Sequence, residues 1–251
     1  MGAGCTGIEL AATLADLLPN WYTLLGGDIA DLRVVVIQRG KEILKGNSDS
    51  LRATAQTALR ERKIAVELMI ETEVIEVRPN TVVLKRNNQI EQLSAATMIW
   101  TTGTAINPLI DTLSIPEASR DKQGRLKLTN TLQLLDFPEV FAGGDCTVME
   151  QPLPATAQVA YQQGAAIAHN LQALTEDRSL FPVDIELRGT LLKLGLDDSV
   201  ADLFNRYQVK GHLGHLIRQA AYVDLLPTPA RNFKGISNGY PMSCSTPSLF
   251  S

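Results

Sequence analysis

The order of hydrophobic and polar residues along the chain switches between a helical and an extended period. Apolar residues recur every three to four positions over residues 8–18, which predicts a helix that ends at Pro19. Residues 32–37 are a continuous β-branched apolar run, as in a strand buried on both faces of a parallel sheet. A helix over 49–63 and a strand over 64–70 follow. This alternation predicts an α/β fold with a doubly wound parallel sheet.

The next part of the chain has the pattern of an antiparallel meander. Short extended runs cover residues 73–93, and turn residues separate them at 79–80 and 87–88. Residues 96–101 are expected to close this part as a buried strand that ends at Gly103. The remaining expected elements are a strand near 126–128, a strand at 140–142, a helix over 154–174, a strand at 184–188, and amphipathic segments at 197–206 and 211–226.

Composition excludes several classes of function. The net charge of −4 argues against a nucleic-acid partner, because phosphate binding needs a basic face. Cys5, Cys146 and Cys244 lie far apart without a C-x-x-C pair, which indicates a reducing compartment and no dithiol or metal site. No apolar run reaches the ~18 residues of a membrane span, and no signal peptide opens the chain. We therefore expect a soluble or peripheral protein.

The chain opens with a G-x-G-x-x-G turn formed by Gly2, Gly4 and Gly7. The first glycine of such a turn permits the tight bend, the second lets a pyrophosphate approach the backbone, and the third lets helix and strand pack closely. The helix that follows offers unpaired N–H groups and a positive dipole end to the phosphates. These glycines are therefore predicted to bind a dinucleotide. The strand that normally precedes the turn is absent, so the chain is expected to begin within a domain.

The end of the strand at 32–37 bears on the choice of nucleotide. A dinucleotide fold that prefers NADH usually has an acid at this point, which binds the ribose 2′-hydroxyl and would repel the 2′-phosphate of NADPH. Here the neutral Gln38 is followed by Arg39 and Lys41. This combination favours NADPH or at least tolerates it. The alternative is that Arg39 only points into solvent.

A second motif lies far from the first. Residues 140–145 read VFAGGD, and the helix that follows carries an A-Q-x-x-x-Q-Q pattern. Together with GAGCTGIE at the start and IWTTGT at 99–104, this motif makes the chain resemble the two-dinucleotide-fold flavoproteins, most closely the type II NAD(P)H:quinone oxidoreductases. Within them the chain is most similar to the cyanobacterial and plastid branch, whose members reduce naphthoquinone-type quinones. The resemblance covers residues 1–230.

The resemblance implies an α/β fold that lacks one part. In that family an N-terminal fold binds the ADP half of FAD, and a second fold inserted within it binds NAD(P)H. The chain would hold an NAD(P)H-binding domain over 1–103, with a truncated first strand, and the C-terminal half of the FAD domain over 104–181. An amphipathic membrane-association segment is expected over 182–234, and a disordered tail over 235–251. Without the N-terminal half of the FAD domain, we expect this chain alone to bind FAD weakly.

The resemblance also assigns residues to the two cofactors. Thr102 and Gly103 would end the inserted domain close to the flavin. Gly144 permits close approach of the backbone, and Asp145 would accept a hydrogen bond from the ribityl chain of the flavin. The helix that begins near Ala157 would direct its positive end at the pyrimidine ring of the flavin.

Three residues are assigned to catalysis by the same resemblance. Glu9 would face the flavin and the nicotinamide and handle a proton, although a carboxylate in a first helical turn also has a purely structural explanation. Gln158 and Gln162 lie four positions apart on one helix face, with Gln163 next to them. Both would line the quinone pocket as uncharged hydrogen-bond donors, with a solvated helix face as the alternative.

The implied function is hydride transfer from NAD(P)H to FAD, followed by transfer of two electrons to a membrane quinone. The expected partners are the quinone and a membrane surface, at the cytoplasmic side of the membrane or in the cytoplasm, and the family allows a homodimer. A ferredoxin- or rubredoxin-type reductase of similar fold is one alternative, and a non-catalytic remnant is another. A disulfide reductase would need a cysteine pair near the flavin, and this chain has none.

Overall fold

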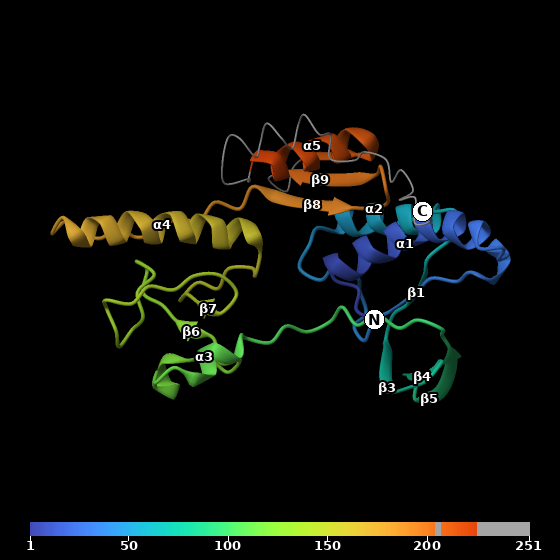
Figure 1. Cartoon of the computed structure of the whole chain (residues 1–251), viewed down its shortest axis with the longest axis horizontal. Coiled ribbons are helices and arrows are strands. Elements are labelled where there is room, and N and C mark those ends of the chain that lie inside the picture. The colour runs from blue at the N-terminus through green and yellow to red at the C-terminus, as the bar shows by residue number, and fades with distance from the viewer. Residues whose placement is uncertain (204–206, 225–251) are drawn as a thin grey trace, which may run out of the picture. The chain divides into compact units, whose positions relative to one another are not determined.

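The computed structural model describes residues 1–203 and 207–224 of the 251-residue chain. The chain divides into two compact units. Among the described residues, unit 1 consists of residues 1–102 together with 189–203 and 207–224, and unit 2 consists of Gly103–Arg188. Figure 1 shows the elements of both units. The expected tail at 235–251 lies outside the described residues, and the roles assigned to the predicted domains stay predictions.

Unit 1 is built around a short parallel sheet and the first helix. Its first half contains α1 (Cys5–Leu24), a 3₁₀ turn (Ile29–Asp31), β1 (Val35–Ile37), α2 (Asp49–Arg60) and β2 (Glu67–Met69). Strands β1 and β2 pair in parallel, with Val36 opposite Leu68. The chain start lies beside the end of this two-stranded sheet, because Gly2 N donates to Ile37 O. Residues 96–101 are not a strand, so that prediction was wrong. In place of a ladder, Met1 N donates to Ile99 O and Thr101 N donates to Met1 O.

Helix α1 continues past the proline that was predicted to end it. Pro19 lies inside the helix and is buried, on the same face as Ala12 and Ala15. A proline in a helix interior removes one backbone hydrogen bond. Here the carbonyl that loses its donor is that of Ala15, four residues before Pro19, whereas Pro19 O accepts from Thr23 Oγ1 at 2.8 Å. Burial of this apolar face outweighs the local cost, and the predicted helix end at Pro19 was wrong.

The predicted meander is confirmed as a three-stranded antiparallel sheet. It contains β3 (Thr72–Arg78), β4 (Thr81–Arg86) and β5 (Gln89–Ser94). Asn87 and Asn88 have φ values of 49° and 61°, the left-handed pair that a tight hairpin turn needs. Asparagine tolerates this region better than most residues, which is why the turn was visible in the sequence.

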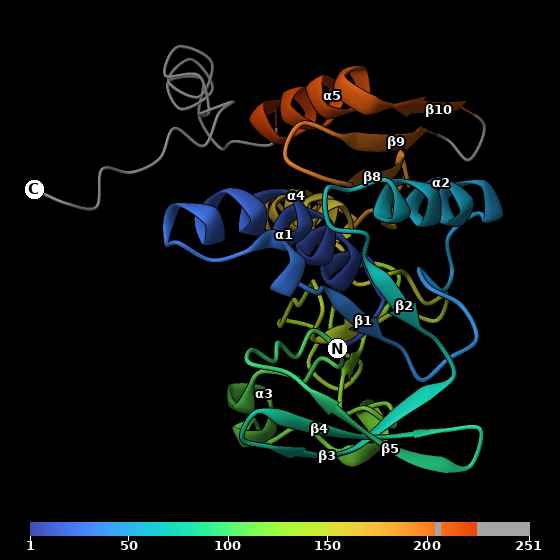
Figure 2. The ribbon, with the colours of Figure 1, turned by 90° about the vertical axis from the view of Figure 1, so that its right-hand side faces the viewer.

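The chain returns to unit 1 with a second small sheet and a helix. These are β8 (Gly189–Lys193), β9 (Ser199–Leu203), β10 (Tyr207–Lys210) and α5 (Gly211–Asp224), and Figure 2 shows them beside α1 and α2. Leu192, Leu194 and Val200 share one core with residues of the first half such as Ile8 and Leu51. The strand predicted at 184–188 does not form, and the observed strand begins only at Gly189. The side chains of Gln162 and Gln158 bind the backbone at Glu186 O and Arg188 N instead.

Polar contacts also join the two halves of unit 1. Arg62, just after α2, bonds Asp16 of α1 at 3.2 Å and Asp198 before β9 at 2.6 Å. Asp202 of β9 is buried and accepts from the hydroxyl of Ser48, the N-cap residue of α2, at 2.7 Å. Strands β8 and β9 and the turn between them are therefore an integral part of the first unit.

Unit 2 packs one long helix on a small core. It contains α3 (Pro108–Thr112), a 3₁₀ turn (Glu117–Ser119), the parallel pair β6 (Leu126–Lys127) and β7 (Thr147–Val148), and α4 (Ala157–Thr175). Its core is formed by leucines, with Ala166 and Ile167 of α4 packed against them. Residues 140–142 contribute only a single bridge, from Phe141 to Gln133. The strand that was predicted there does not form, so that prediction was wrong.

Candidate functional site

The glycine turn admits no side chain at two of its three glycines. A Cβ at Gly7 would lie 1.9 Å from Gly2 O. Gly2 has φ +105°, and a Cβ there would lie 2.9 Å from Thr102 Cβ. Nothing lies within 4 Å of a Cβ at Gly4, so this side of the turn is open. The turn therefore leaves space at its middle glycine, and the binding of a pyrophosphate there stays a prediction.

The N-terminal end of α1 is also open. Gly4 is its N-cap residue, no side chain caps the helix, and Gly4, Cys5 and Thr6 are exposed. The first intrahelical bond runs from Ile8 N to Gly4 O at 3.0 Å. The N–H groups of the first turn therefore point out of the helix, where the dipole favours an anion. This arrangement is suited to a pyrophosphate.

The end of β1 lies against the turn. Gln38 Oε1 accepts from Ala3 N at 3.2 Å, and Gln38 Nε2 donates to Glu42 O at 3.3 Å. Leu44 N donates to Ala3 O at 2.8 Å, so both polar groups of Ala3 are satisfied from this segment. Arg39 is exposed. The structure thus brings Gln38, but not the side chain of Arg39, into contact with the glycine turn.

Glu9 contacts the C-terminal part of unit 1. Its Oε1 accepts from Lys193 N of β8 at 2.7 Å, and Arg218 Nη2 of α5 lies 3.7 Å from the same oxygen. Burial and the nearby Glu9 carboxylate raise the pKa of the Cys5 thiol. These contacts give Glu9 a structural role in joining α1 to β8. A role in proton handling stays a prediction.

Thr102 is the last residue before unit 2 in the sequence, and Gly103 is the first residue of unit 2. Thr101 Oγ1 donates to Met1 O at 2.8 Å, which holds this segment beside the glycine turn. Thr102 is exposed, and Gly103 has φ +83°, a region that favours glycine. The predicted proximity of both residues to a flavin stays a prediction.

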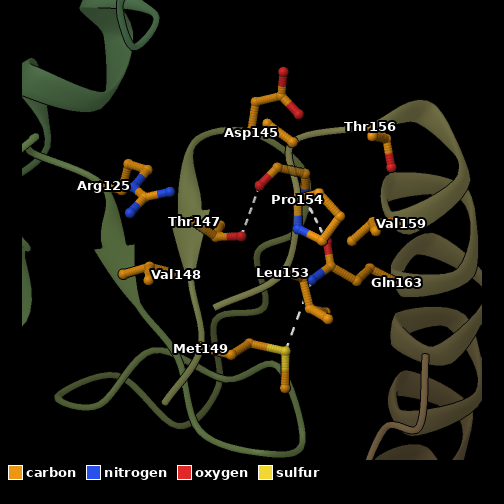
Figure 3. Close-up of a pocket in the computed structure, with 12 residues that line it drawn as sticks. Arg125, Asp145, Thr147, Val148, Met149, Leu153, Pro154, Thr156, Val159 and Gln163 are labelled. Atoms are coloured by element: carbon orange, nitrogen blue, oxygen red, sulfur yellow. Dashed lines mark hydrogen bonds between the residues drawn. The ribbon is translucent and has the colours of Figure 1, made fainter. Parts of the chain in front are cut away.

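Unit 2 has a pocket at the predicted Gly-Asp motif. It is lined by Gly144 and Asp145, by residues of β7, and by the segment that leads into α4 (Figure 3). Gly144 has φ +79°, and Asp145 is exposed at the rim. Thr156 is the N-cap residue of α4 without a side-chain cap bond, so the positive end of the helix opens on the pocket.

Two residues of this pocket had no assigned role in the sequence. Gln163 is 3% exposed, and its Oε1 accepts from Gly144 N at 2.7 Å, which ties α4 to the glycine pair. Its position beside Gln162 gave no signal that it faces inward. Arg125 also lines the pocket and is paired with Asp121 at 2.7 Å. A lone arginine at the start of β6 carries no pattern that would have marked it.

Gln158 and Gln162 bind the backbone of their own chain. Gln162 Nε2 donates to Glu186 O at 3.0 Å, and Glu186 N donates back to Gln162 Oε1 at 3.1 Å. Gln158 Oε1 accepts from Arg188 N at 3.1 Å. We call residues 184–188 the strap. The shared face of the two glutamines is as predicted, but the strap occupies their amide groups.

Other features of the described residues bear on function only indirectly. Within residues 1–203 and 207–224, no helix is both long and apolar enough to cross a membrane. In the same part of the chain, no three His, Cys, Asp or Glu side chains are grouped so that they could hold a metal ion. His215 is buried between α5 and β9, and this burial lowers its pKa.

Comparisons with known proteins agree with these features. The family model described as pyridine nucleotide-disulphide oxidoreductase matches residues 1–164. A type II NADH:quinone oxidoreductase from Staphylococcus epidermidis is 30% identical over 210 residues, which cover 82% of this chain and 51% of that protein. A protein of the same name from Staphylococcus aureus is 28% identical with the same coverage.

Solved structures show the same fold at lower identity. NDH2 from Plasmodium falciparum in complex with NADH has a TM-score of 0.81 at 18% identity, over 96% of this chain and 65% of that one. A sulfide:quinone oxidoreductase from Aquifex aeolicus has a TM-score of 0.66 at 14% identity, over 85% of this chain and 52% of that one. The predicted α/β class is thereby confirmed.

The extent of these matches is as informative as their names. The chain spans about half the length of the curated relatives that it matches. The family model covers both the glycine turn and the Gly144–Asp145 motif, and it reaches into α4. With its match over well above half of the 251 residues, this chain belongs to the pyridine nucleotide-disulphide oxidoreductase family.

Proposed function

We propose that this chain is part of a type II NAD(P)H:quinone oxidoreductase that reduces a naphthoquinone-type quinone, as in the cyanobacterial and plastid branch. One observation carries the proposal. A single chain contains an open glycine turn at a helix N-terminus and, later, a Gly-Asp pocket at the N-terminus of a second long helix. The names of the relatives from Staphylococcus support the acceptor class.

The glycine turn is the proposed site for NAD(P)H. Gly4 leaves space for the pyrophosphate, and the exposed first turn of α1 supplies N–H donors to it. Gly2 and Gly7 keep the turn tight, since neither has room for a side chain. Gln38 and Arg39 stand at the end of β1, where the adenosine ribose is bound in dinucleotide folds. Because no acid stands there, NADPH is accepted.

The pocket of unit 2 is the proposed contribution to FAD binding. The left-handed Gly144 lets the backbone approach a ligand, and the exposed Asp145 can accept from a hydroxyl of the ribityl chain. The N-terminus of α4, at Ala157, places a positive dipole end at the pocket. These features fit a flavin. Bound FAD would supply the hydride and electron transfer chemistry of the reaction.

The acceptor side is proposed to involve Gln158 and Gln162, which can donate to a quinone carbonyl without a charge once the strap releases their amide groups. Glu9 is proposed to handle a proton, and Thr102 with Gly103 to lie close to the flavin. Exposed Leu213 and Tyr222 on α5 support peripheral contact with the cytoplasmic side of a membrane. The electrons would then pass to a quinone dissolved in the lipid.

The test begins with the genomic sequence upstream of the chain. An in-frame first G-x-G-x-x-G would define a longer protein, which should be yellow from bound FAD and should oxidise NAD(P)H with menadione. The 251-residue chain should bind NAD(P)H and bind FAD only weakly. A completed protein that reduces ferredoxin or rubredoxin but not menadione would contradict the quinone assignment.

A further inference from the structure

The chain returns along α4 after the helix ends, and side-chain amides of α4 hold it there. Residues 181–188 run back along the helix, from Asn170 to Gln158. Asn170 Oδ1 accepts from Phe181 N at 2.9 Å, and Asn170 Nδ2 donates to Phe181 O at 3.0 Å. Gln162 and Gln158 bind the backbone of the strap further on. The three amides therefore belong to one row of positions with a spacing of four residues.

The row lacks an amide at one position, which is Ala166. An alanine side chain ends at Cβ, so it cannot reach the returning segment as the longer amides do. A cavity of about 320 Å³ lies at this point of the helix. Its lining consists of residues of α4 and of the start of the returning segment: Ala166, His169, Asn170, Phe181, Pro182 and Val183. Small organic ligands occupy cavities of this volume in proteins.

The lining is aromatic and aliphatic, with one available polar group. The side chain of Phe181 is 55% exposed, and Pro182 beside it is exposed as well. The amide of Asn170 is already used, since its Nδ2 donates to both Thr131 O and Phe181 O. Within residues 1–203 and 207–224, His169 has no hydrogen bond or ion pair, so its imidazole can bind a ligand. No lysine, arginine, aspartate or glutamate lines the cavity, which favours an uncharged ligand.

The cavity is separate from the pocket at Gly144 and Asp145. The two have no lining residue in common. Helix α4 begins at Ala157, and His169 lies about 18 Å further along its axis at a rise of about 1.5 Å per residue. A molecule in the cavity therefore does not contact a flavin bound at the N-terminus of α4.

We propose that this cavity is a second binding site, which takes a small uncharged aromatic molecule that carries a hydroxyl or carbonyl oxygen. Its ring stacks on Phe181 and contacts Ala166, and its oxygen forms a hydrogen bond with His169. Removal of the exposed ring of Phe181 from water favours binding. The site does not depend on the function proposed above, because none of its residues belongs to the glycine turn or to the pocket at Gly144.

The experiment measures binding of 2-naphthol and of naphthalene to the 251-residue chain by equilibrium dialysis. The two probes differ by one hydroxyl group. The variants are Ala166→Leu, which fills the cavity, and His169→Phe, which keeps a ring but removes the hydrogen bond. Ala168→Leu, at an exposed position of α4 outside the lining, is the matched control. Thermal unfolding checks that each variant is folded, and Ala166→Val replaces Ala166→Leu if the latter does not fold.

2-Naphthol should bind one to one and about two- to tenfold more tightly than naphthalene, the scale of one hydrogen bond. His169→Phe should make the two affinities equal. Ala166→Leu should weaken both probes about tenfold or more, because the ring no longer fits, whereas Ala168→Leu should change neither by more than about twofold.

Amide hydrogen exchange places the bound probe. Phe181 N and Val183 N donate to Asn170 Oδ1 and to Asn130 O, and at ten times the dissociation constant of 2-naphthol their exchange should slow by up to about tenfold. Unchanged exchange at both amides, equal binding to Ala166→Leu and Ala168→Leu, or displacement of 2-naphthol by FAD would overturn the assignment. If 2-naphthol behaved as expected but NAD(P)H did not bind, the proposed function would fail and this site would stand.

Discussion

Replacing Gln162 by leucine should release the strap from α4. The change removes both hydrogen bonds from this side chain to the strap, from Gln162 Nε2 to Glu186 O and from Glu186 N to Gln162 Oε1, besides a bond within α4 to Gln158 O. Each such bond contributes about 0.5–1.5 kcal/mol net, which gives about 1–3 kcal/mol for the pair. Glu186 is exposed, so water partly replaces the lost partners, and we expect the low end of this range, about 1 kcal/mol. The local opening equilibrium of the strap should then shift by about fivefold.

Amide hydrogen exchange measures this opening directly. Glu186 N–H should exchange about five times faster in Gln162→Leu, while amides of the α4 core keep their protection. Gln172→Leu is a matched control, because Gln172 lies on the same helix and its amide donates to Glu176 Oε1 at 2.9 Å and not to the strap. It should leave the strap unchanged. Equal protection of Glu186 in the unmodified chain and in Gln162→Leu would refute the reasoning, since the glutamine would then not hold the strap.

Three further outcomes follow from unit 1. Gly7→Ala places a Cβ 1.9 Å from a backbone carbonyl oxygen and should lower the free energy of unfolding by about 1–3 kcal/mol in chemical denaturation. Gly4→Ala has open space around the new Cβ and should lower it by less than about 1 kcal/mol, so equal losses would contradict the geometry of the turn. Arg62→Met leaves two partly buried carboxylates without their cation and should cost about 2–4 kcal/mol, against less than about 1 kcal/mol for the exposed pair lost in Arg33→Met, as urea titration can determine. The pKa of His215 is lowered by burial, so the unfolded chain binds its proton more readily than the folded chain does. The contribution of His215 to the free energy of unfolding should be fully present above pH 6.5 and fall as the pH drops below that value. A His215→Gln variant with the same pH dependence of unfolding would refute this.

Local patterns in the sequence predicted the elements whose stability is local. The turn at Asn87-Asn88 has residues that tolerate left-handed φ, and the glycine turn leaves no room for a Cβ at Gly2 and Gly7. Both signals depend on neighbours within a few residues. The helix at α4 was visible for the same reason, because its apolar and small residues recur with a helical period over a long window.

Long-range contacts decided the features that the sequence did not show. Pro19 stays inside α1 because its face is buried by other elements, and residues 96–101 have only one backbone partner, at Met1. The amide groups of Gln158 and Gln162 were expected to face a ligand. Their partners lie 30 residues further along the chain for Gln158 and 24 for Gln162, a separation at which no periodic pattern connects two segments.

The return of the chain to unit 1 has a consequence for the order of folding. Leu192 and Val200 complete a core that begins with Ile8, yet the whole of unit 2 is synthesised between them. Closing so long a loop costs entropy before any of these contacts form, although the cost grows only with the logarithm of loop length. During synthesis, α1 and α2 therefore keep apolar surface exposed to solvent until β8 and β9 have been synthesised. Unit 2, whose residues are contiguous, can fold first, and chaperone dependence should concentrate on the nascent first hundred residues.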